Sequence, residues 1–506
     1  MKRITVCHSG LSGIILGCRK GSRRTSFAGM TVLAAFMAFL AFASCTVGPN
    51  YVKPTTEVPA SYKEIDGWKK AEPKDETLKG AWWEIFDDPQ LNLLEERVII
   101  SNQNIAVAEA QFSQARALVQ SARSGYFPTV AAGASFVRVR RSANVGGGTF
   151  AGADTTSDFL LPVNASWEPD IWGKVRRTVE SARAGAEASA ADLEAVRLSA
   201  RAELAQDYFQ LRALDAERKL LDETVIAFQK SLELTRNRYA SGVASRADVL
   251  QAETQLKSTQ AQALDIGVQR SQLEHAIALL VGKPASDFSL PAAPLDAVPP
   301  YIPIGLPSEL LERRPDIAAA ERRVASANAL IGVAESAFYP SITLSASGGF
   351  EASSLSKWLS WPSRFWSVGT AIAETVFEGG LRRSLTDQAR AAYDADVASY
   401  RQTVLTGFQE VEDNLAALRI LEEEAGMQDE AVKAARQTVT VVTNQYKAGT
   451  VSYLDVIVSQ TTALNNERTA VGIQGRRMIA SISLIKALGG GWESSSLFLT
   501  DSVRGK

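Results

Sequence analysis

The chain has 506 residues, of which 46% are hydrophobic and 22% are charged, a composition typical of folded proteins. Its formal net charge is −2 at pH 7, so we expect no nucleic acid among its partners. The length suggests more than one structural unit.

The first residues predict a signal peptide. Residues 1–44 contain several Lys and Arg but no acidic residue, and an apolar run from Phe27 to Ala43 ends in small residues before Cys45. This order is typical of cleaved secretory signals, and a retained membrane anchor is the alternative. The ending ASC resembles a bacterial lipobox, so we expect Cys45 to become the lipidated first residue of the mature chain.

Without this segment the chain keeps one Cys and one His, Cys45 and His275. A disulfide within the chain is then excluded, as are zinc or haem sites built on clusters of Cys and His. A Ser-His-Asp triad has only His275 to use, and this residue lies in a helical pattern, SQLEHAIALL, without a supporting motif. We interpret it as an ordinary helix residue and expect no enzyme, no metal and no cofactor except the lipid on Cys45.

The rest of the chain is an internal duplication. The segment NRYASGVASRADVL (237–250) matches NQYKAGTVSYLDVI (444–457), and ARSGYFPTV (122–130) matches AESAFYPSI (334–342) in the same order. The predicted division is a signal peptide at 1–44, a lipidated N-terminal segment at 45–90, a first repeat at 91–282, a proline-rich linker at 283–306, a second repeat at 307–489 and a C-terminal tail at 490–506.

Each repeat begins with a helix and, after a pair of strands, continues with a very long helix and a shorter one. At 91–125 apolar residues recur at spacings of 3 and 4, which predicts an amphipathic helix that Pro128 ends. The same periodicity runs without proline through 174–239, about 100 Å of helix, and 379–446 is its copy. The helices at 91–125 and 247–281 are each about half as long, so two of them end to end match one long helix.

Period-2 alternation predicts the strands that precede each long helix. It is clear at 159–167 and 341–350, and less clear in the partner strands near 129–141 and 364–376. Tryptophans lie at the strand ends, where interfacial aromatic residues occur in membrane barrels; they are Trp167, Trp358, Trp361 and Trp366. A soluble sandwich with exposed tryptophans at its edge is the alternative.

Four strands of about ten residues can cross a bilayer but cannot close a barrel, because the smallest spanning barrels have about eight strands. In lipid, an open sheet edge leaves backbone groups without hydrogen-bond partners. Strands in a membrane therefore require several copies of the chain, and three copies would supply twelve strands. The long amphipathic helices likewise need neighbours along their whole length.

A set of motifs resembles the TolC-like outer-membrane efflux family. They are CTVGPNYVKPTTEVP (45–59), AWWEIFDDPQLNLL (81–94), the YFP and FYP strand starts, WEPDIWGKVRR (167–177) and RRPDIAAAERRV (313–324). More narrowly, they resemble its lipidated, NodT-like branch, which works with resistance–nodulation–division pumps. The resemblance extends from Cys45 to about Gly490.

The resemblance implies a fold that is mainly α with a small membrane β part. A homotrimer would form a 12-stranded β-barrel in the outer membrane, four strands per chain, continuous with an α-helical barrel that crosses the periplasm. A periplasmic adaptor and an inner-membrane pump would dock at the far end. Thr46, which follows Cys45, favours delivery to the outer membrane, and the implied function is passive export of drugs or other small molecules.

The motif repeated at 237–250 and 444–457 marks the turn between the last two helices of each repeat. Gly242 and Gly449 supply the positive backbone dihedrals of such a turn. Asp248 and Asp455 lie near the start of the next helix, where a carboxylate accepts hydrogen bonds from exposed N–H groups. A capped helical hairpin is therefore one explanation for these residues.

A periplasmic gate is the other explanation, because by resemblance the helix tips of this family close the tunnel and receive the adaptor. Six aspartates near one axis would form an acidic ring that selects cations. The gate residues of this hypothesis are Asp248, Asp455, Arg246, Tyr446 and Tyr453. The expected adaptor contacts are Gly242, Val243, Ala244, Gly449, Thr450 and Val451. Arg246 corresponds to Tyr453 in the other repeat, so the two turns are not equivalent.

The alternative function is a non-conducting, lipid-anchored coiled-coil scaffold in the periplasm. Its helices would show the same periodicity. The alternating strands with interfacial tryptophans, placed alike in both repeats, argue against it.

Overall fold

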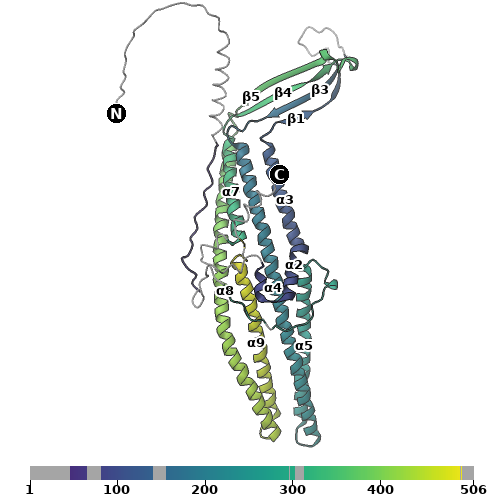
Figure 1. The fold of residues 1–506 in the computed structure, drawn as a ribbon, viewed down its shortest axis with the longest axis vertical. Coiled ribbons are helices and arrows are strands. Elements are labelled where there is room, and N and C mark those ends of the chain that lie inside the picture. The colour runs from purple at the N-terminus through teal and green to yellow at the C-terminus, as the bar shows by residue number, and fades with distance from the viewer. Residues whose placement is uncertain are drawn as a thin grey trace, which may run out of the picture.

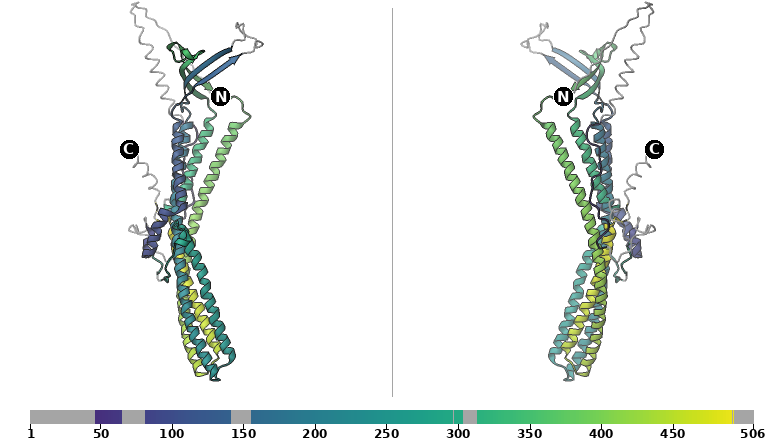
Figure 2. Two further views of the ribbon diagram at one scale, coloured as in Figure 1. Left: turned by 90° about the vertical axis from the view of Figure 1, so that its right-hand side faces the viewer. Right: turned by 90° about the vertical axis from the view of Figure 1, so that its left-hand side faces the viewer.

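The computed structural model describes residues 46–64, 81–140, 155–295, 297–302, 313–490 and 492. The predicted signal peptide and Cys45 lie outside these residues. Figures 1 and 2 show an elongated molecule with a β-sheet at one end, the sheet end, and two helix turns at the other, the tip end.

The helical part consists of two very long helices and several shorter ones. The α-helices are α2 (Pro89–Ser101), α3 (Gln103–Ser124), α4 (Lys174–Ala240), α5 (Arg246–Leu280), α7 (Pro315–Ser336), α8 (Leu381–Ala448) and α9 (Tyr453–Ala487). Helices α4 and α8 have 67 and 68 residues, which makes each about 100 Å long. Neighbouring helices pack in the order α3, α4, α7, α8 near the sheet end and α5, α4, α9, α8 near the tip end (Figure 1).

Shorter helices meet end to end beside each long helix, as the sequence predicts. Gly282, just after α5, lies against Ser101 at the end of α2, and Gly489, just after α9, lies against Arg313 before α7. A Cβ atom at either glycine would collide with the carbonyl oxygen of that neighbour, and both glycines have positive φ. These two close approaches let the helix ends meet without a gap.

The single helix predicted at 91–125 is in fact two helices, α2 and α3. Asn102 separates them: its side-chain oxygen accepts hydrogen bonds from the backbone N–H groups of Asn104 and Ile105, at 2.9 and 3.1 Å. Its amide group donates to the carbonyl of Leu280 at 2.9 Å. The apolar periodicity continues across the break, because both helices pack on the same core, and so it concealed the cap.

The sheet is antiparallel throughout and follows the predicted pairing. Strands β1 (Thr129–Ala132) and β2 (Ser135–Arg140) both pair with β3 (Thr155–Trp167), which pairs with β4 (Ser341–Ala352), which pairs with β5 (Arg364–Ala373). The expected strand near 129–141 is interrupted opposite Pro162, which accepts a hydrogen bond from Gly133 N at 3.0 Å but has no N–H to return.

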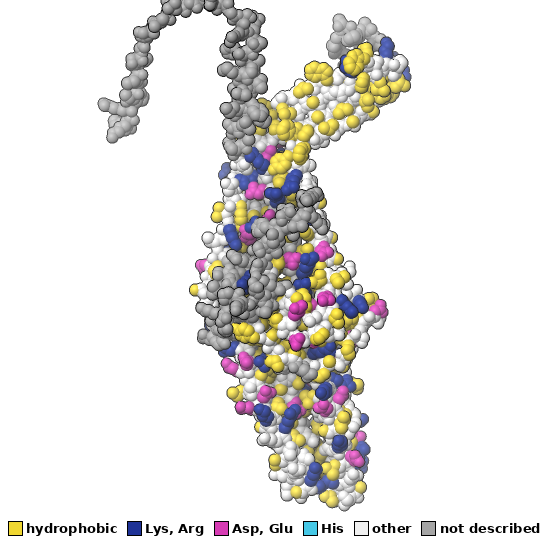
Figure 3. Space-filling model, viewed as in Figure 1, with side chains coloured by type: hydrophobic (Ala, Val, Ile, Leu, Met, Phe, Trp, Pro, Cys, Tyr) yellow, Lys and Arg dark blue, Asp and Glu magenta, His cyan; other side chains and the backbone are white. Residues whose placement is uncertain are grey.

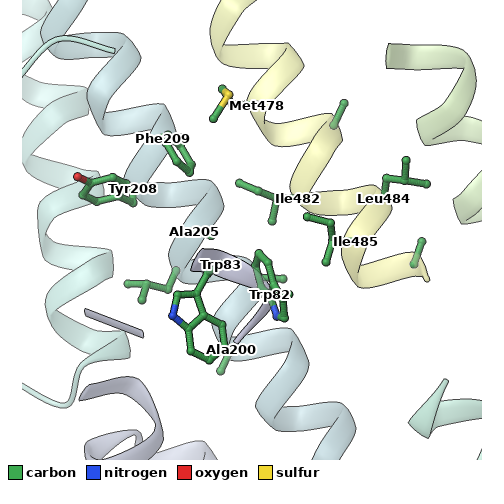
Figure 4. Packing of buried hydrophobic residues seen from close by; sticks show 14 of the residues in the cluster. Trp82, Trp83, Ala200, Ala205, Tyr208, Phe209, Met478, Ile482, Leu484 and Ile485 are labelled. Carbon is green, nitrogen blue, oxygen red and sulfur yellow. The ribbon is translucent and has the colours of Figure 1, made fainter. Parts of the chain in front are cut away.

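The main hydrophobic core lies midway along the molecule, where α2 and the short helix η2 (Trp82–Phe86) pack on α4 and α9. Figure 4 shows Phe209 and Trp82 facing Ile482 and Ile485 of α9, with Trp83 next to Trp82 on the side away from α9. The remaining labelled members are Ala200, Ala205, Tyr208, Met478 and Leu484. Segments far apart in the sequence are thereby fixed to α4.

The proline-rich linker is held against the helices by a buried ion-pair network. Asp215 of α4 contacts Arg212 at 3.3 Å and Arg270 of α5 at 2.7 Å. Arg212 donates to the carbonyl of Pro291, and Arg270 donates to that of Leu290, both at 2.7 Å. Because burying these charges is costly unless they are paired, the linker backbone completes the network.

The segment at residues 46–64, here called the N-terminal strap, runs from the sheet end along α7 and α8. Val47 N donates to the carbonyl of Trp172 at 3.1 Å, and Arg177 donates to the carbonyls of Val47 and Gly48 at 3.1 and 3.0 Å. Farther on, Glu64 forms an ion pair of 2.7 Å with Arg419 of α8. The strap therefore begins at the sheet end.

Glu95 on α2 is a buried carboxyl with 0% exposure. Neither of its oxygens has a hydrogen-bond partner among the described residues. Burial raises the pKa of Glu95 well above its usual range, while the nearby Arg201 guanidinium opposes the shift. The folded chain therefore keeps a proton that an unfolded chain loses above pH of about 4.3.

We predict that Glu95→Gln stabilises the protein at pH 7 to 8 and flattens its pH dependence. Since the raised pKa makes the folded state bind the extra proton, wild-type stability falls as the pH rises above the unfolded value. Thermal unfolding in detergent between pH 5 and pH 8 measures this, with the exposed neighbour variant Glu96→Gln as control. A lower melting temperature for Glu95→Gln at every pH would contradict the prediction, since it would mean that a charged Glu95 pairs with Arg201.

Candidate functional site at the helix tips and the sheet

The first turn of the tip end joins α4 to α5. Gly242 has φ of 76°, and the N–H groups of Val243 and Ala244 donate to the carbonyl of Arg238 at 2.8 and 3.1 Å. Ser245 and Asp248 form a capping box: Asp248 N donates to Ser245 Oγ at 3.1 Å, and Ser245 N donates to Asp248 Oδ2 at 2.9 Å. The predicted cap at Asp248 is thus present.

The second turn, from α8 to α9, repeats this construction. Gly449 has φ of 83°, and Thr450 N donates to the carbonyl of Gln445 at 3.0 Å. Asp455 Oδ2 accepts hydrogen bonds from both the backbone N–H and the hydroxyl of Ser452, at 3.0 and 2.7 Å. Asp455 is exposed and Asp248 is half-buried, so at least one carboxylate of each copy faces solvent at the tip.

The other three predicted gate residues, Tyr446, Tyr453 and Arg246, are not hydrogen-bonded to Asp248 or Asp455 within one copy. Tyr446 and Tyr453 are buried, with ring centroids 5.3 Å apart, in a small core between the two hairpins. The Tyr453 hydroxyl shares a hydrogen bond of 3.0 Å with Ser231, and burial raises its pKa. Arg246 is exposed and forms no ion pair with any described residue. A single copy therefore does not bring these three residues into hydrogen bonds with Asp248 or Asp455.

The sequence analysis missed Arg238, which ties the first hairpin to the second. Its guanidinium lies over the ring of Tyr446, 4.7 Å from the centroid, and donates to the carbonyl of Lys447 at 3.2 Å. Arg238 corresponds to Gln445 in the other repeat, and Tyr239, the counterpart of Tyr446, is 47% exposed. The difference between Arg238 and Gln445 in otherwise matching turns is the sequence signal for it.

The predicted adaptor contacts all lie at the outer surface of the two turns. Val243 is 65% exposed, and an added Cβ at Gly242 or Gly449 would meet open space. Thr450 is exposed, while Ala244 and Val451 are half-buried. Both turns thus present small or apolar side chains to solvent at the tip end, where they lie side by side (Figures 1 and 2).

The sheet has an apolar face and a polar face, because paired residues in an antiparallel sheet point to the same side. The apolar face includes Phe159, Leu161, Val163, Leu344, Phe350, Trp366, Val368 and Ile372. The polar face includes Asn164, Ser166, Thr343, Ser345, Ser347 and Ser367. Several of the apolar residues are strongly exposed, among them Trp366 at 80% and Val368 at 75%. An exposed apolar face of this extent favours contact with lipid.

The described residues contain neither an apolar membrane-spanning helix nor a cluster of metal-ligating side chains. None of the described helices combines the length and apolarity needed to cross a bilayer. No group of three His, Cys, Asp or Glu residues in the same ranges is placed to hold a metal ion.

The sequence pattern of the family described as outer membrane efflux protein matches residues 94–283 and 306–490. The chain belongs to this family. It is 30% identical over 469 residues to the probable efflux pump outer membrane protein TtgC of Pseudomonas putida, which covers 92% of this chain and 96% of that protein. It is also 30% identical over 422 residues to the pyoverdine export outer membrane protein OpmQ of Pseudomonas aeruginosa, covering 82% of this chain and 88% of that one.

Among solved structures, the outer-membrane channel OprN superposes with a TM-score of 0.82 and 32% identity, covering 88% of this chain and all of that chain. The family, the fold of long helices with a small antiparallel sheet, and the function as an outer-membrane efflux channel are therefore confirmed. A channel family also excludes the non-conducting scaffold and an enzyme.

We predict that Arg238→Gln loosens the second turn. The loss of the cation–π contact and of a charged hydrogen bond removes roughly 1–2 kcal/mol, so amide hydrogens of residues 444–452 should exchange about 5–30 times faster. Hydrogen–deuterium exchange with mass spectrometry measures this. The control is Arg236→Gln, which removes one positive charge from the same helix. Arg236 is exposed and lies 3.7 Å from Glu253. Equal exchange in the two variants would disprove the role of Arg238.

Proposed function

We propose that three copies of this chain form a passive exit duct, with a 12-stranded barrel in the outer membrane and a helical tunnel through the periplasm. The observation that supports it best is the pair of open edges in one copy. Strands β1 and β2 form one edge of the sheet and β5 the other. The helical layer has corresponding edges, α3 with α5 on one side and α8 on the other.

This arrangement allows the sheet and the helical layer to close at the same time. When β5 of one copy pairs with β1 and β2 of the next, α8 of the first copy comes beside α3 and α5 of the second. Every backbone group of the sheet then finds a partner, as the bilayer requires. The apolar face lies against lipid and the polar face lines the duct. The two repeats, 91–282 and 307–489, supply equivalent halves of each copy.

The anchor and the partners follow from the two ends of the molecule. Thr46 contacts Gly173 at the sheet end, which supports a lipid on Cys45 inserted in the membrane next to the barrel. The turns containing Gly242, Val243, Ala244, Gly449, Thr450 and Val451 meet the periplasmic adaptor. An inner-membrane pump of the resistance–nodulation–division type supplies the energy, since the duct is passive. The cargo consists of small molecules, in keeping with the pyoverdine exported by one relative.

The gate of the duct lies at the tip end. Trimer formation brings six turns towards one axis, and with them six carboxylates from Asp248 and Asp455. Such a ring attracts cations, and it stays closed only where its carboxylates are paired, because like charges repel one another. Arg246 remains the cation nearest in sequence to Asp248 and is free to meet a carboxylate of another copy. Tyr446 and Tyr453 contribute by fixing the two hairpins to each other.

We predict that the double variant Asp248→Asn, Asp455→Asn passes severalfold larger and less cation-selective currents in planar bilayers. Loss of the six negative charges lowers the cation selectivity and the electric field at the aperture. The substitutions also weaken each capping box, by about 1 kcal/mol at most. The matched control is Asp265→Asn, Asp429→Asn, which removes the same charge from exposed positions on the shafts of α5 and α8.

Three outcomes separate the possible conclusions. Larger currents in the tip variant but not in the control support the gate. Unchanged currents in both would keep the duct and leave the aspartates as helix caps only. If intact trimers of all three proteins fail to conduct, the duct itself is wrong.

A further inference from the structure

A basic rim lies at the far end of the sheet. Arg138 and Arg140 follow Phe136 at every second position of β2, and Arg364 begins β5. Phe136 pairs with Phe159 and Arg364 pairs with Phe350, so all three arginines share the apolar face of the sheet. All three are exposed. Figure 3 shows basic side chains gathered at this end, next to the hydrophobic ones.

The acidic residues at the same level point to the other face. Asp158 pairs with Val137, and Glu351 pairs with Leu160, which places both carboxylates on the polar side of the sheet. Among the described strand residues, charge at this end is therefore sorted by side. The polar face that lines the duct carries the acids, and the face turned to lipid carries the bases.

Aromatic residues mark the depth at which the rim begins. The rings of Phe136 and Phe159 are 4.6 Å apart, and Trp358 lies 5.8 Å from Phe159. From Trp167 to Phe159 the apolar face of β3 spans about 26 Å along the strand, enough for most of the apolar band of a tilted strand. Arg138 and Arg140 lie just beyond this aromatic border, and Arg364 lies level with Leu161, just inside it. All three lie near the level of the lipid headgroups, where a charge on the lipid face is tolerated.

We propose that Arg138, Arg140 and Arg364 bind phosphate groups of anionic lipid headgroups in the outer leaflet. The proposal rests on the proposed trimeric duct, which completes the site. In one copy, Arg364 is separated from β2 by three strand spacings, about 14 Å. In the closed barrel, Arg364 of the partner subunit begins the strand that pairs with β2, only about 5 Å away.

The chemistry of the rim fits the phosphate groups of lipid headgroups. Guanidinium groups bind phosphate oxygens through paired hydrogen bonds. Arg364 is already oriented, because its Nε donates to the carbonyl of Trp361 at 3.1 Å and its guanidinium lies over the Trp361 ring. Trp361 is 73% exposed, so it can lie among the headgroups. Three such clusters then surround the duct.

The test is retention of diphosphoryl lipid A by the purified trimer in detergent, measured by native mass spectrometry. The variant Arg138→Gln, Arg140→Gln, Arg364→Gln should retain at least about tenfold less of it than wild type. The milder variant Arg138→Gln, Arg140→Gln keeps the contact between Arg364 and Trp361 and should show an intermediate loss. The control Lys219→Gln, Lys230→Gln, Lys433→Gln removes the same charge from exposed helix positions and should retain the lipid as wild type does.

Two further probes identify the group that is bound. Lipid A without phosphate groups should bind wild type and the rim variants equally weakly, and inorganic phosphate should not displace diphosphoryl lipid A. Equal retention of diphosphoryl lipid A by all variants, or an equal loss in the lysine control, would overturn the proposal. Conductance of the rim variants is measured in parallel. If both conductance and lipid retention stay at the wild-type level, the proposal for the rim is wrong while the proposed duct is still supported.

Discussion

The need to pair every backbone hydrogen-bonding group inside a bilayer governs this structure. In the sheet of one copy, β3 and β4 have a neighbouring strand on both sides, whereas β1, β2 and β5 each have one edge without a neighbouring strand. Water can satisfy such edges and lipid cannot. In the proposed trimer the chain is therefore one segment of a closed ring, and the same closure would determine which helices become neighbours, where the tips converge and which face of the sheet lines the duct.

The helical half meets a related requirement, since a helix of about 100 Å has to be covered along its whole length. Two shorter helices in line cover each long one, and the close contacts at Gly282 and Gly489 join them. The aromatic core of η2 and α2 holds this junction, while the strap and the linker bind across the helices through Arg177, Asp215 and Arg270. The result is a continuous helical shaft between the sheet end and the tip end.

Duplication produced two halves with one architecture and two different tips. Both turns use a glycine with positive φ and a Ser–Asp capping box. The two turns differ at the residues through which they contact each other. Arg238 stands where the second repeat has Gln445, and Tyr446 is buried while its counterpart Tyr239 is exposed. The contact between the two hairpins is therefore asymmetric, although the two turns have the same backbone construction.

Local patterns in the sequence determined the helices, the strands, the capped turns and the duplication, because periodicity, glycine and capping residues act over a few neighbouring positions. The same patterns concealed the break at Asn102 and the interruption opposite Pro162, since each depends on a partner strand or helix that periodicity does not identify. Only the tertiary structure decided that Tyr446 and Tyr453 lie inside the protomer and that Arg238 reaches Lys447. The contacts of Arg238 with Tyr446 and Lys447, and of Tyr453 with Ser231, join residues more than two hundred positions apart. They depend on the packing of α9 against both α4 and α8.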